Sequence, residues 1–482
     1  MSKRSERLFA ALGEIDRQRV DEAAPVGEKT ARRKQWGRRR WLGAVAALLA
    51  VVIAAGAFLR PGGAMTAYAI AQAEYPKMAP YPSGLGQLSE KAYDEWWEDM
   101  SAQRRDLGDT SALEAFFARS ARTFLTQEPG ENRVYSPLNV YMALSMLAQL
   151  TDGDSRGQIL ALLGSSSMEE LRKQAGDVWN SSYRDDGAVT SILASSLWLD
   201  QGVKFNQGTM DTLARDFYAS SYRGEMGSDA FNRALQDWLN EQTGGLLEEQ
   251  AGNVELDRDT ILALATTLYF KAKWQGEFSK EKTTPQTFHG PEGDVETDFM
   301  HQRGNGTYYW GDKFAAVSQP FKQGGAMWFL LPDEGVAPEE LLADKEAAEF
   351  LFAADKYEWE KQKYLIVNKA IPKFDVSSQF DLGEGLRALG ITDVYDPAVS
   401  DFSPMTADAG APIFLSKADH AARVVIDEEG CTATAFTVLA EGGAAAPPED
   451  EVDFVLDRPF LFAVTGDSGL PLFTGVVNQP NE

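Results

Sequence analysis

Cysteine and histidine are nearly absent from this sequence of 482 residues. Cys431 is the single cysteine, and the three histidines, His289, His301 and His420, lie far apart. One thiol cannot form an intrachain disulfide, and these few side chains cannot supply a structural zinc site. A phosphate-binding loop and the HExxH and CxxC motifs are also missing. We therefore expect no metal and no cofactor, and these absences give no support to an enzyme.

Positive charge is scarce everywhere except at the N-terminus. The net charge is −26, but the first 40 residues hold 12 Lys and Arg against 6 Asp and Glu. The remaining residues therefore carry −32, from 34 basic and 66 acidic side chains. An acidic body repels polyanions, so we expect neither nucleic acid nor a heparin-type glycan as a partner.

A long hydrophobic run follows the basic N-terminus. The 19 residues from Trp41 to Leu59 are uncharged, which is enough to cross a bilayer core of roughly 30 Å. Three arginines (38–40) precede the run, so the positive-inside rule keeps the N-terminus in the cytoplasm. We predict a cytoplasmic basic tail (1–40), an uncleaved transmembrane signal-anchor (41–59) and an extracytoplasmic body at the cell surface.

A cleaved signal peptide is the alternative, because small residues at positions 67–69 lie downstream of the run. The body would then be secreted. The positively charged region before the run would be unusually long for such a peptide, so we favour the anchor. The basic anchor and the lack of disulfides suggest a bacterial surface protein.

The remainder is predicted to be a spacer (60–109) followed by one large domain (110–482). Pro and Gly interrupt the spacer, which holds one predicted helix at 89–105. Helical periodicity dominates the first part of the domain and strand patterns the later part, which is typical of an α+β fold. The predicted helices are 110–124, 137–149, 155–163, 205–222 and 231–242, and the predicted strands are 189–199, 260–271, 314–321, 326–331, 364–374, 460–464 and 471–477.

The stretch from Ile426 to Pro448 combines strand-forming and loop-forming residues. Ten uncharged residues (431–440) follow Gly430, and a tip rich in Gly, Ala and Pro closes the stretch. Two interpretations fit: an ordinary strand followed by a loop, or a loop that can become a strand. With a period of two, one small or apolar face carries Cys431, Ala433, Ala435, Thr437 and Leu439.

Seven short segments resemble segments of the serpin family, in the same order, over residues 110–480. Leu268–Trp274 is similar to the family's YFKGxW segment, with Ala272 in the place of the usual glycine. The other segments are 132–137 with 143–147, 329–335, 371–374, 389–392, 415–420 and 457–462.

This resemblance implies a serpin fold, with helices, three β-sheets and an exposed reactive-centre loop, and it implies a suicide inhibitor of serine proteases. In this family a protease attacks the loop and forms an acyl-enzyme, and the cleaved loop inserts as a strand into the central sheet. Counting 14 residues on from Gly430 puts the reactive bond between Ala444 and Ala445. The hinge implied by the resemblance is Glu428, Glu429, Gly430, Cys431, Thr432, Ala433, Thr434 and Ala435.

The resemblance also implies residues that control opening of the sheet. Ser136, Asn139 and His420 match the shutter, and Trp274 lies with Glu428 at the entry point. We expect changes at these positions to alter metastability and not protease choice.

The loop itself departs from the family in composition. Phe436 stands where the family prefers a small residue, but its parity is outward, so it need not block insertion. The tip (442–446) offers nothing large or charged, so we predict elastase- or subtilisin-like serine proteases as targets. A cysteine protease stays open as a target, and we expect a monomer.

The alternative function is a non-inhibitory serpin-fold binding or chaperone protein. Charge, proline or bulky inward residues between positions 431 and 437 would favour that alternative. Their absence favours inhibition.

Overall fold

The computed structural model describes residues 67–82, 87–406, 412–415, 418–431 and 449–480. They belong to a unit that spans Pro61–Glu482. The predicted tail (1–40) and the predicted anchor (41–59) lie outside the described residues. Among the helices that are described, none combines the length and the apolar character needed to cross a bilayer.

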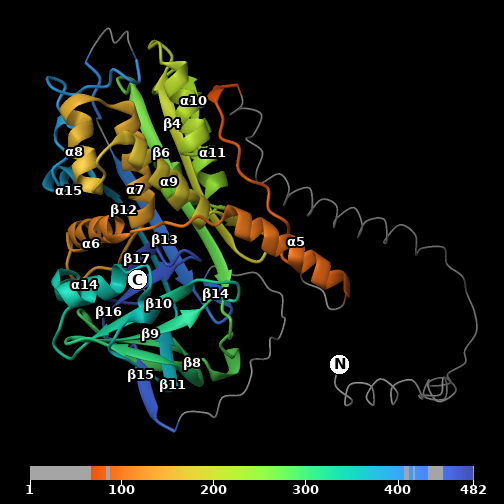
Figure 1. Cartoon of the computed structure of the whole chain (residues 1–482). Coiled ribbons are helices and arrows are strands. Elements are labelled where there is room, and N and C mark those ends of the chain that lie inside the picture. The colour runs from red at the N-terminus through yellow and green to blue at the C-terminus, as the bar shows by residue number, and fades with distance from the viewer. Residues whose placement is uncertain (1–66, 83–86, 407–411, 416–417, 432–448, 481–482) are drawn as a thin grey trace, which may run out of the picture. The chain divides into compact units, whose positions relative to one another are not determined.

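A central sheet contains β6 (Leu262–Lys273), which confirms the apolar strand predicted at 260–271 (Figure 1). Its strands follow the order β1-β5-β4-β6-β14-β13-β12, and β3 pairs with β4 outside this path. The other strands are β1 (Ala69–Ala71), β3 (Arg184–Asp185), β4 (Thr190–Asp200), β5 (Ala219–Gly224), β12 (Phe374–Asp381), β13 (Asp419–Ile426) and β14 (Gly430–Cys431).

The two edges of β6 are unequal. β4 pairs with β6 from Leu262 to Lys271, in an antiparallel ladder. On the opposite edge, the described residues pair only at Ala272 and Lys273, with the two residues of β14. β13, the next strand in the order, pairs with β14 through Ile426 and Cys431. We call the β13-facing edge of β6, over residues 262–270, the open edge.

A second sheet has the order β15-β11-β8-β9-β10-β16-β17-β2, with β7 paired to β8. The resemblance predicts three sheets, but the 18-residue β8 pairs with β7, β11 and β9 and so joins strands that would otherwise form separate sheets. Its strands are β2 (Arg133–Tyr135), β7 (Thr284–Gly290), β8 (Gly293–Trp310), β9 (Phe314–Pro320), β10 (Ala326–Pro332), β11 (Gln362–Pro372), β15 (Glu451–Val455), β16 (Phe460–Thr465) and β17 (Pro471–Val477).

Two helices matter most for the central sheet. α7 (Pro137–Leu150) is buried on nearly all sides and begins at Ser136, whose hydroxyl accepts the Asn139 N–H as an N-cap. α11 (Asp229–Gln242) packs Phe231 edge-on against Trp198 of β4, with the ring centroids 5.1 Å apart. The other helices are α5 (Gln87–Gln103), α6 (Ser111–Leu125), α8 (Gly153–Leu163), α9 (Met168–Ser182), α10 (Gln207–Asp216), α12 (Glu248–Gly252), α13 (Pro338–Ala343), α14 (Lys345–Phe352) and α15 (Gly383–Ala388), with short 3-10 turns at Lys280–Lys282, Lys356–Glu358 and Asp393–Tyr395.

One predicted helix, residues 205–222, is wrong in its second half. α10 ends at Asp216, and Ala219–Gly224 form β5, parallel to β4. Tyr218 separates them with a φ of 52°, which a right-handed helix does not accommodate. Pairing with β4 decides the conformation of these residues over their local preference.

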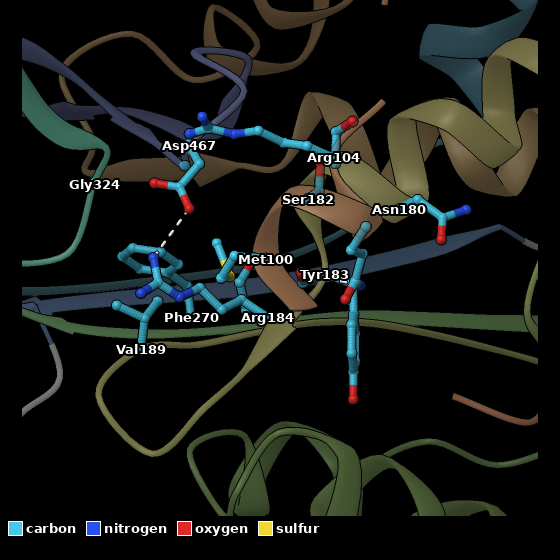
Figure 2. A pocket seen from close by; sticks show the side chains of 14 residues that line it. Met100, Arg104, Asn180, Ser182, Tyr183, Arg184, Val189, Phe270, Gly324 and Asp467 are labelled. Carbon is cyan, nitrogen blue, oxygen red and sulfur yellow. Dashed lines mark hydrogen bonds and ion pairs between the residues drawn. The ribbon is translucent and has the colours of Figure 1, made fainter. Parts of the chain in front are cut away.

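The region predicted as a spacer (60–109) packs against the domain in its described part. β1 pairs antiparallel with β5 at the edge of the central sheet. Trp96 of α5 is buried and donates its indole N–H to Asp186 Oδ2 at 2.9 Å. Arg184 also binds Asp186 at 2.8 Å, and it pairs with Asp467 at 3.0 Å, the ion pair that Figure 2 shows. The described part of this region thus covers the domain and is no free spacer.

The packing of α5 predicts different costs for two adjacent tryptophans. Trp96 is 4% exposed and Trp97 51%. Trp96→Ala should lower the free energy of unfolding by about 3 kcal/mol, because it leaves a cavity and removes one of the hydrogen bonds to Asp186 Oδ2. Trp97→Ala should change it by less than about 0.5 kcal/mol. Urea unfolding of the two variants measures this, and equal costs would mean that α5 does not pack on the domain.

Candidate functional site

The candidate site starts at β14, where the chain enters the central sheet. Gly430 pairs with Lys273 and Cys431 pairs with Ala272 of β6. A Cβ at Gly430 would lie 2.3 Å from the Ala272 carbonyl oxygen, so only glycine permits this approach. Cys431 is buried and occupies the position of a compact inward residue. Gly430 and Cys431, the first residues after the turn that follows β13, thus pair with the end of β6.

A tight turn connects β13 to β14. The Asp427 carboxylate accepts the backbone N–H groups of Glu429 at 2.8 Å and Gly430 at 3.1 Å. The Asp427 N–H in turn donates to the Gly430 carbonyl at 3.1 Å. These bonds use the backbone donors that a reversal of the chain would otherwise leave unpaired.

Trp274 holds this turn from the end of β6. Its backbone N–H donates to the Glu429 carbonyl at 3.1 Å, and its indole N–H donates to the Asp427 carbonyl at 2.8 Å. The buried indole stacks on Phe321, with the ring centroids 5.0 Å apart and the planes inclined by 8°. The structure thus brings Trp274 and the hinge together.

Glu428 points into the protein beside the turn. Its carboxylate accepts bonds from Thr283 Oγ1 at 2.9 Å and forms an ion pair with Lys373 at 3.1 Å. Burial acts to raise the pKa of Glu428, but its backbone hydrogen bond and the bonds from Lys373 and Thr283 outweigh burial and lower it. Glu429 pairs with Lys280 at 2.7 Å on the surface. Sequence reasoning missed these partners, because they are distant in the chain.

Ser136, Asn139 and His420 also lie together, below the sheet. The Ser136 N–H donates to His420 Nε2 at 3.2 Å, and the Ser136 hydroxyl donates to the Leu472 carbonyl at 2.6 Å. The Asn139 amide donates to the Thr266 carbonyl of β6 at 3.2 Å. α7 therefore contacts both β6 and β13, the two strands that border the open edge.

His420 is neutral in this environment. Its ring is buried against Tyr135, with centroids 5.3 Å apart, and its Nε2 acts as an acceptor. Burial lowers the pKa of His420 to about 3. A protonated ring could not accept the Ser136 N–H, so protonation of His420 would break this hydrogen bond.

The connection from α11 to α12 crosses the open edge on the other face of the sheet. Gly244, with a φ of +60°, lies so close to Tyr269 of β6 that an added Cβ would be 2.9 Å from the ring. The Leu246 carbonyl accepts a bond from Arg423 of β13 at 3.1 Å. Within three residues this connection thus touches both bordering strands.

The residues Gly153–Gly157 fit the GxSxG pattern of hydrolases, a signal that sequence reasoning missed. In a nucleophile elbow the serine is exposed on a turn between a strand and a helix. Ser155 instead is buried in the first turn of α8 and accepts the Asp401 N–H at 3.1 Å. This geometry presents no nucleophile.

Part of the predicted site lies outside the described residues. This applies to the reactive bond, Ala444–Ala445, and to the hinge residues Thr432, Ala433, Thr434 and Ala435. The structure describes the rest of the site. It consists of β14 with its turn, the cluster of Ser136, Asn139 and His420, and the connection from α11 to α12.

These elements form an α+β fold whose central sheet has an open edge, with β14 paired to β6 at one end of it. The comparisons with known proteins identify the family that has this fold. A model of the family "Serpin (serine protease inhibitor)" matches residues 111–480. The chain belongs to the serpin family.

Its relatives are plant and animal serpins. Serpin-Z2B of Triticum aestivum is 28% identical over 379 residues, which cover 76% of this chain and 94% of the relative. Serine proteinase inhibitor A3K of Cavia porcellus is 28% identical over 380 residues, covering 76% and 88%. The native stressed conformation of Arabidopsis AtSerpin1 superposes with a TM-score of 0.67 at 25% identity, over 78% of this chain and 100% of that chain. Human thyroxine-binding globulin shares the fold, with a TM-score of 0.67 at 24% identity, over 78% and 100%.

The buried neutral His420 predicts a loss of stability in acid. Below pH 6.5 the His420 ring of the unfolded chain binds a proton, whereas the ring in the folded chain binds one only near pH 3. The free energy of unfolding should therefore fall by about 1.4 kcal/mol per pH unit in this window from His420 alone. Urea unfolding between pH 7.5 and 4.5 should show a shallower fall for His420→Gln than for the wild type.

His289→Gln provides the control for this experiment, because His289 is exposed and pairs with Asp294. An ion pair raises its pKa, so His289 contributes stability below pH 6.5 and loses it as the pH rises through the folded pKa. His289→Gln should still show the fall in the free energy of unfolding with decreasing pH that the wild type shows. Equal slopes in the wild type and His420→Gln would contradict the account of the shutter.

Proposed function

We propose that this protein is a protease inhibitor that acts as a suicide substrate. The observation that supports this most is β14, whose two residues pair with β6 at one end of the open edge. If the chain were cut between residues 442 and 446, the residues after Cys431 could continue the same ladder between β6 and β13. A new antiparallel strand would then fill the central sheet.

The proposed chemistry belongs to the protease. Its serine Oγ attacks the carbonyl carbon of Ala444, an ester forms, and the bond to the Ala445 nitrogen breaks. The leaving amine takes the proton that the protease's general base removed from the serine. Insertion of the ester-linked segment then pulls the protease across the sheet and distorts its active site before water can hydrolyse the ester.

The loop composition supports serine proteases with small, apolar primary pockets. Residues 442–446 are Gly and Ala only, so an elastase- or subtilisin-like site accepts them without an unpaired charge. A cysteine protease would form a thioester at the same carbonyl.

Covalent trapping is the direct test. The full chain, mixed with elastase- and subtilisin-like proteases, should give a band at the summed mass that resists SDS, with cleavage after Ala444 by mass spectrometry. Ala444→Arg should transfer trapping to trypsin-like proteases. If Ala444→Arg keeps its original target and gains no trypsin-like one, the reactive bond lies elsewhere in the tip.

Ala433→Arg is a matched control for insertion. It places a charge on the inward face, two residues from the buried Cys431, and should permit cleavage while abolishing the complex. Cleavage of the wild type without a complex would argue against the inhibitor.

We further propose that residues 41–59 anchor the protein in a membrane, with the serpin domain extracytoplasmic, as at a bacterial cell surface. The supporting observation is the uncharged run behind a cluster of arginines. Removal of this run by a signal peptidase would make the protein secreted.

Fractionation distinguishes the two fates. The anchored chain should remain in the membrane pellet after an alkaline wash, and deletion of residues 1–60 should release it. An N-terminus that begins near residue 70 in the mature protein would instead mean that the run is cleaved.

A non-inhibitory binding protein is the second candidate. Two observations favour it: Phe436 stands where the family prefers a small residue, and the fold is shared with a thyroxine-binding globulin solved in complex with thyroxine. In that case loop cleavage should leave thermal stability unchanged and trap no protease.

A further inference from the structure

A cavity lies against the open edge, between the sheet and the helices above it. Its volume is about 110 Å³. Its walls are mainly apolar and come from both sides of the opening. Representative lining residues are Leu235 and Leu239 of α11, Ala251 of α12, Ala265 and Thr267 of β6, and Ala421 of β13.

The roof of this cavity is fastened to both bordering strands. Arg423 of β13 holds the Leu246 carbonyl, and its guanidinium is itself fixed by Asp375 of β12 at 2.6 and 2.8 Å. Gly244 rests on Tyr269 of β6. A strand added along the open edge would therefore run beneath this roof, and its roof-facing side chains would be enclosed by protein.

The register of β14 fixes which side chains those are. Gly430 lies opposite Lys273 and Cys431 opposite Ala272, so each further loop residue moves one residue back along β6. Phe436 then arrives opposite Thr267. Opposite residues of an antiparallel pair share a face, and Thr267 shares its face with Tyr269, which touches the roof.

The neighbouring loop residue meets a different environment. Ala435 arrives opposite Leu268, on the same inner face as Phe270. Phe270 is buried and packs against Phe321, with ring centroids 5.2 Å apart. In this register the small Ala435 would face the closely packed inner side of the sheet. The large Phe436 would face the side that borders the cavity.

We propose that this cavity is the seat of the Phe436 side chain once the loop has inserted. The inference rests on the proposed strand insertion and assigns Phe436 a role as a positioning residue in it. An apolar cavity of roughly 150 Å³ can hold benzene, so about 110 Å³ is of the right order for a phenyl ring. The bulky residue then strengthens insertion instead of obstructing it.

The test compares the thermal midpoint of the full chain before and after loop cleavage by a subtilisin-type protease, with the cut site read by mass spectrometry. The wild type should gain stability on cleavage. Phe436→Ala should gain roughly 5 °C less, because the ring no longer fills the cavity. Before cleavage the two proteins should melt within about 1 °C of each other, which controls for folding.

A register-shifted variant is the matched control. A435F/F436A keeps the composition and moves the ring to the filled inner face, so its gain should be smaller than that of Phe436→Ala alone. Ala265→Leu fills the cavity from β6, so it should reduce the gain of the wild type but leave that of Phe436→Ala nearly unchanged.

The outcomes separate two failures. If the cleaved wild type gains no stability, insertion does not occur and the proposed function falls together with this inference. If the wild type gains stability but Phe436→Ala gains as much, or A435F/F436A matches the wild type, the cavity does not hold Phe436. Insertion itself would then stand.

Discussion

The open edge of β6 is the constraint on which the rest of the structure depends. A strand edge carries backbone N–H and C=O groups that need partners, and most proteins avoid leaving one inside a sheet. Here the described residues give β6 a full ladder with β4 on one edge and only two paired residues on the other. The Asn139 amide donates a hydrogen bond to the carbonyl of Thr266, halfway along the open edge. The fold is thus arranged around a position between β6 and β13 that, beyond β14, no strand of the described residues occupies.

Three sets of contacts surround the open edge, and each is of a different kind. At the entry, Trp274 and the Asp427 turn hold β14 with backbone hydrogen bonds. Further along, α7 and His420 join the bordering strands through buried polar contacts that tolerate no added charge. Above, the α11–α12 connection ties β6 to β13 through Arg423. These contacts are individually modest, so cooperative opening needs only a few of them to break.

The sequence predicts local features of this site better than its contacts. The apolar strand β6 and the helix that starts at Pro137 follow from residue chemistry and are confirmed in the structure. The partners of Glu428 and Leu246 could not be predicted, because Lys373 and Arg423 are brought to them only by the assembled sheet. The error at 205–222 has the same origin, since pairing with β4 overrides the helical pattern. The packing of α5 on the domain could not be predicted from the sequence, because Trp96 and its partner Asp186 are 90 residues apart in the chain.

Hydrogen exchange of β6 is the measurement that tests the central claim most directly. Amides on the open edge, from Leu262 to Phe270, should be weakly protected in the intact protein. Cleavage within residues 442–446 should protect them strongly, as an inserted strand supplies their partners, while amides bonded to β4 change little. Unchanged exchange after complete cleavage would contradict the account, because the open edge would then not be the place where the loop goes.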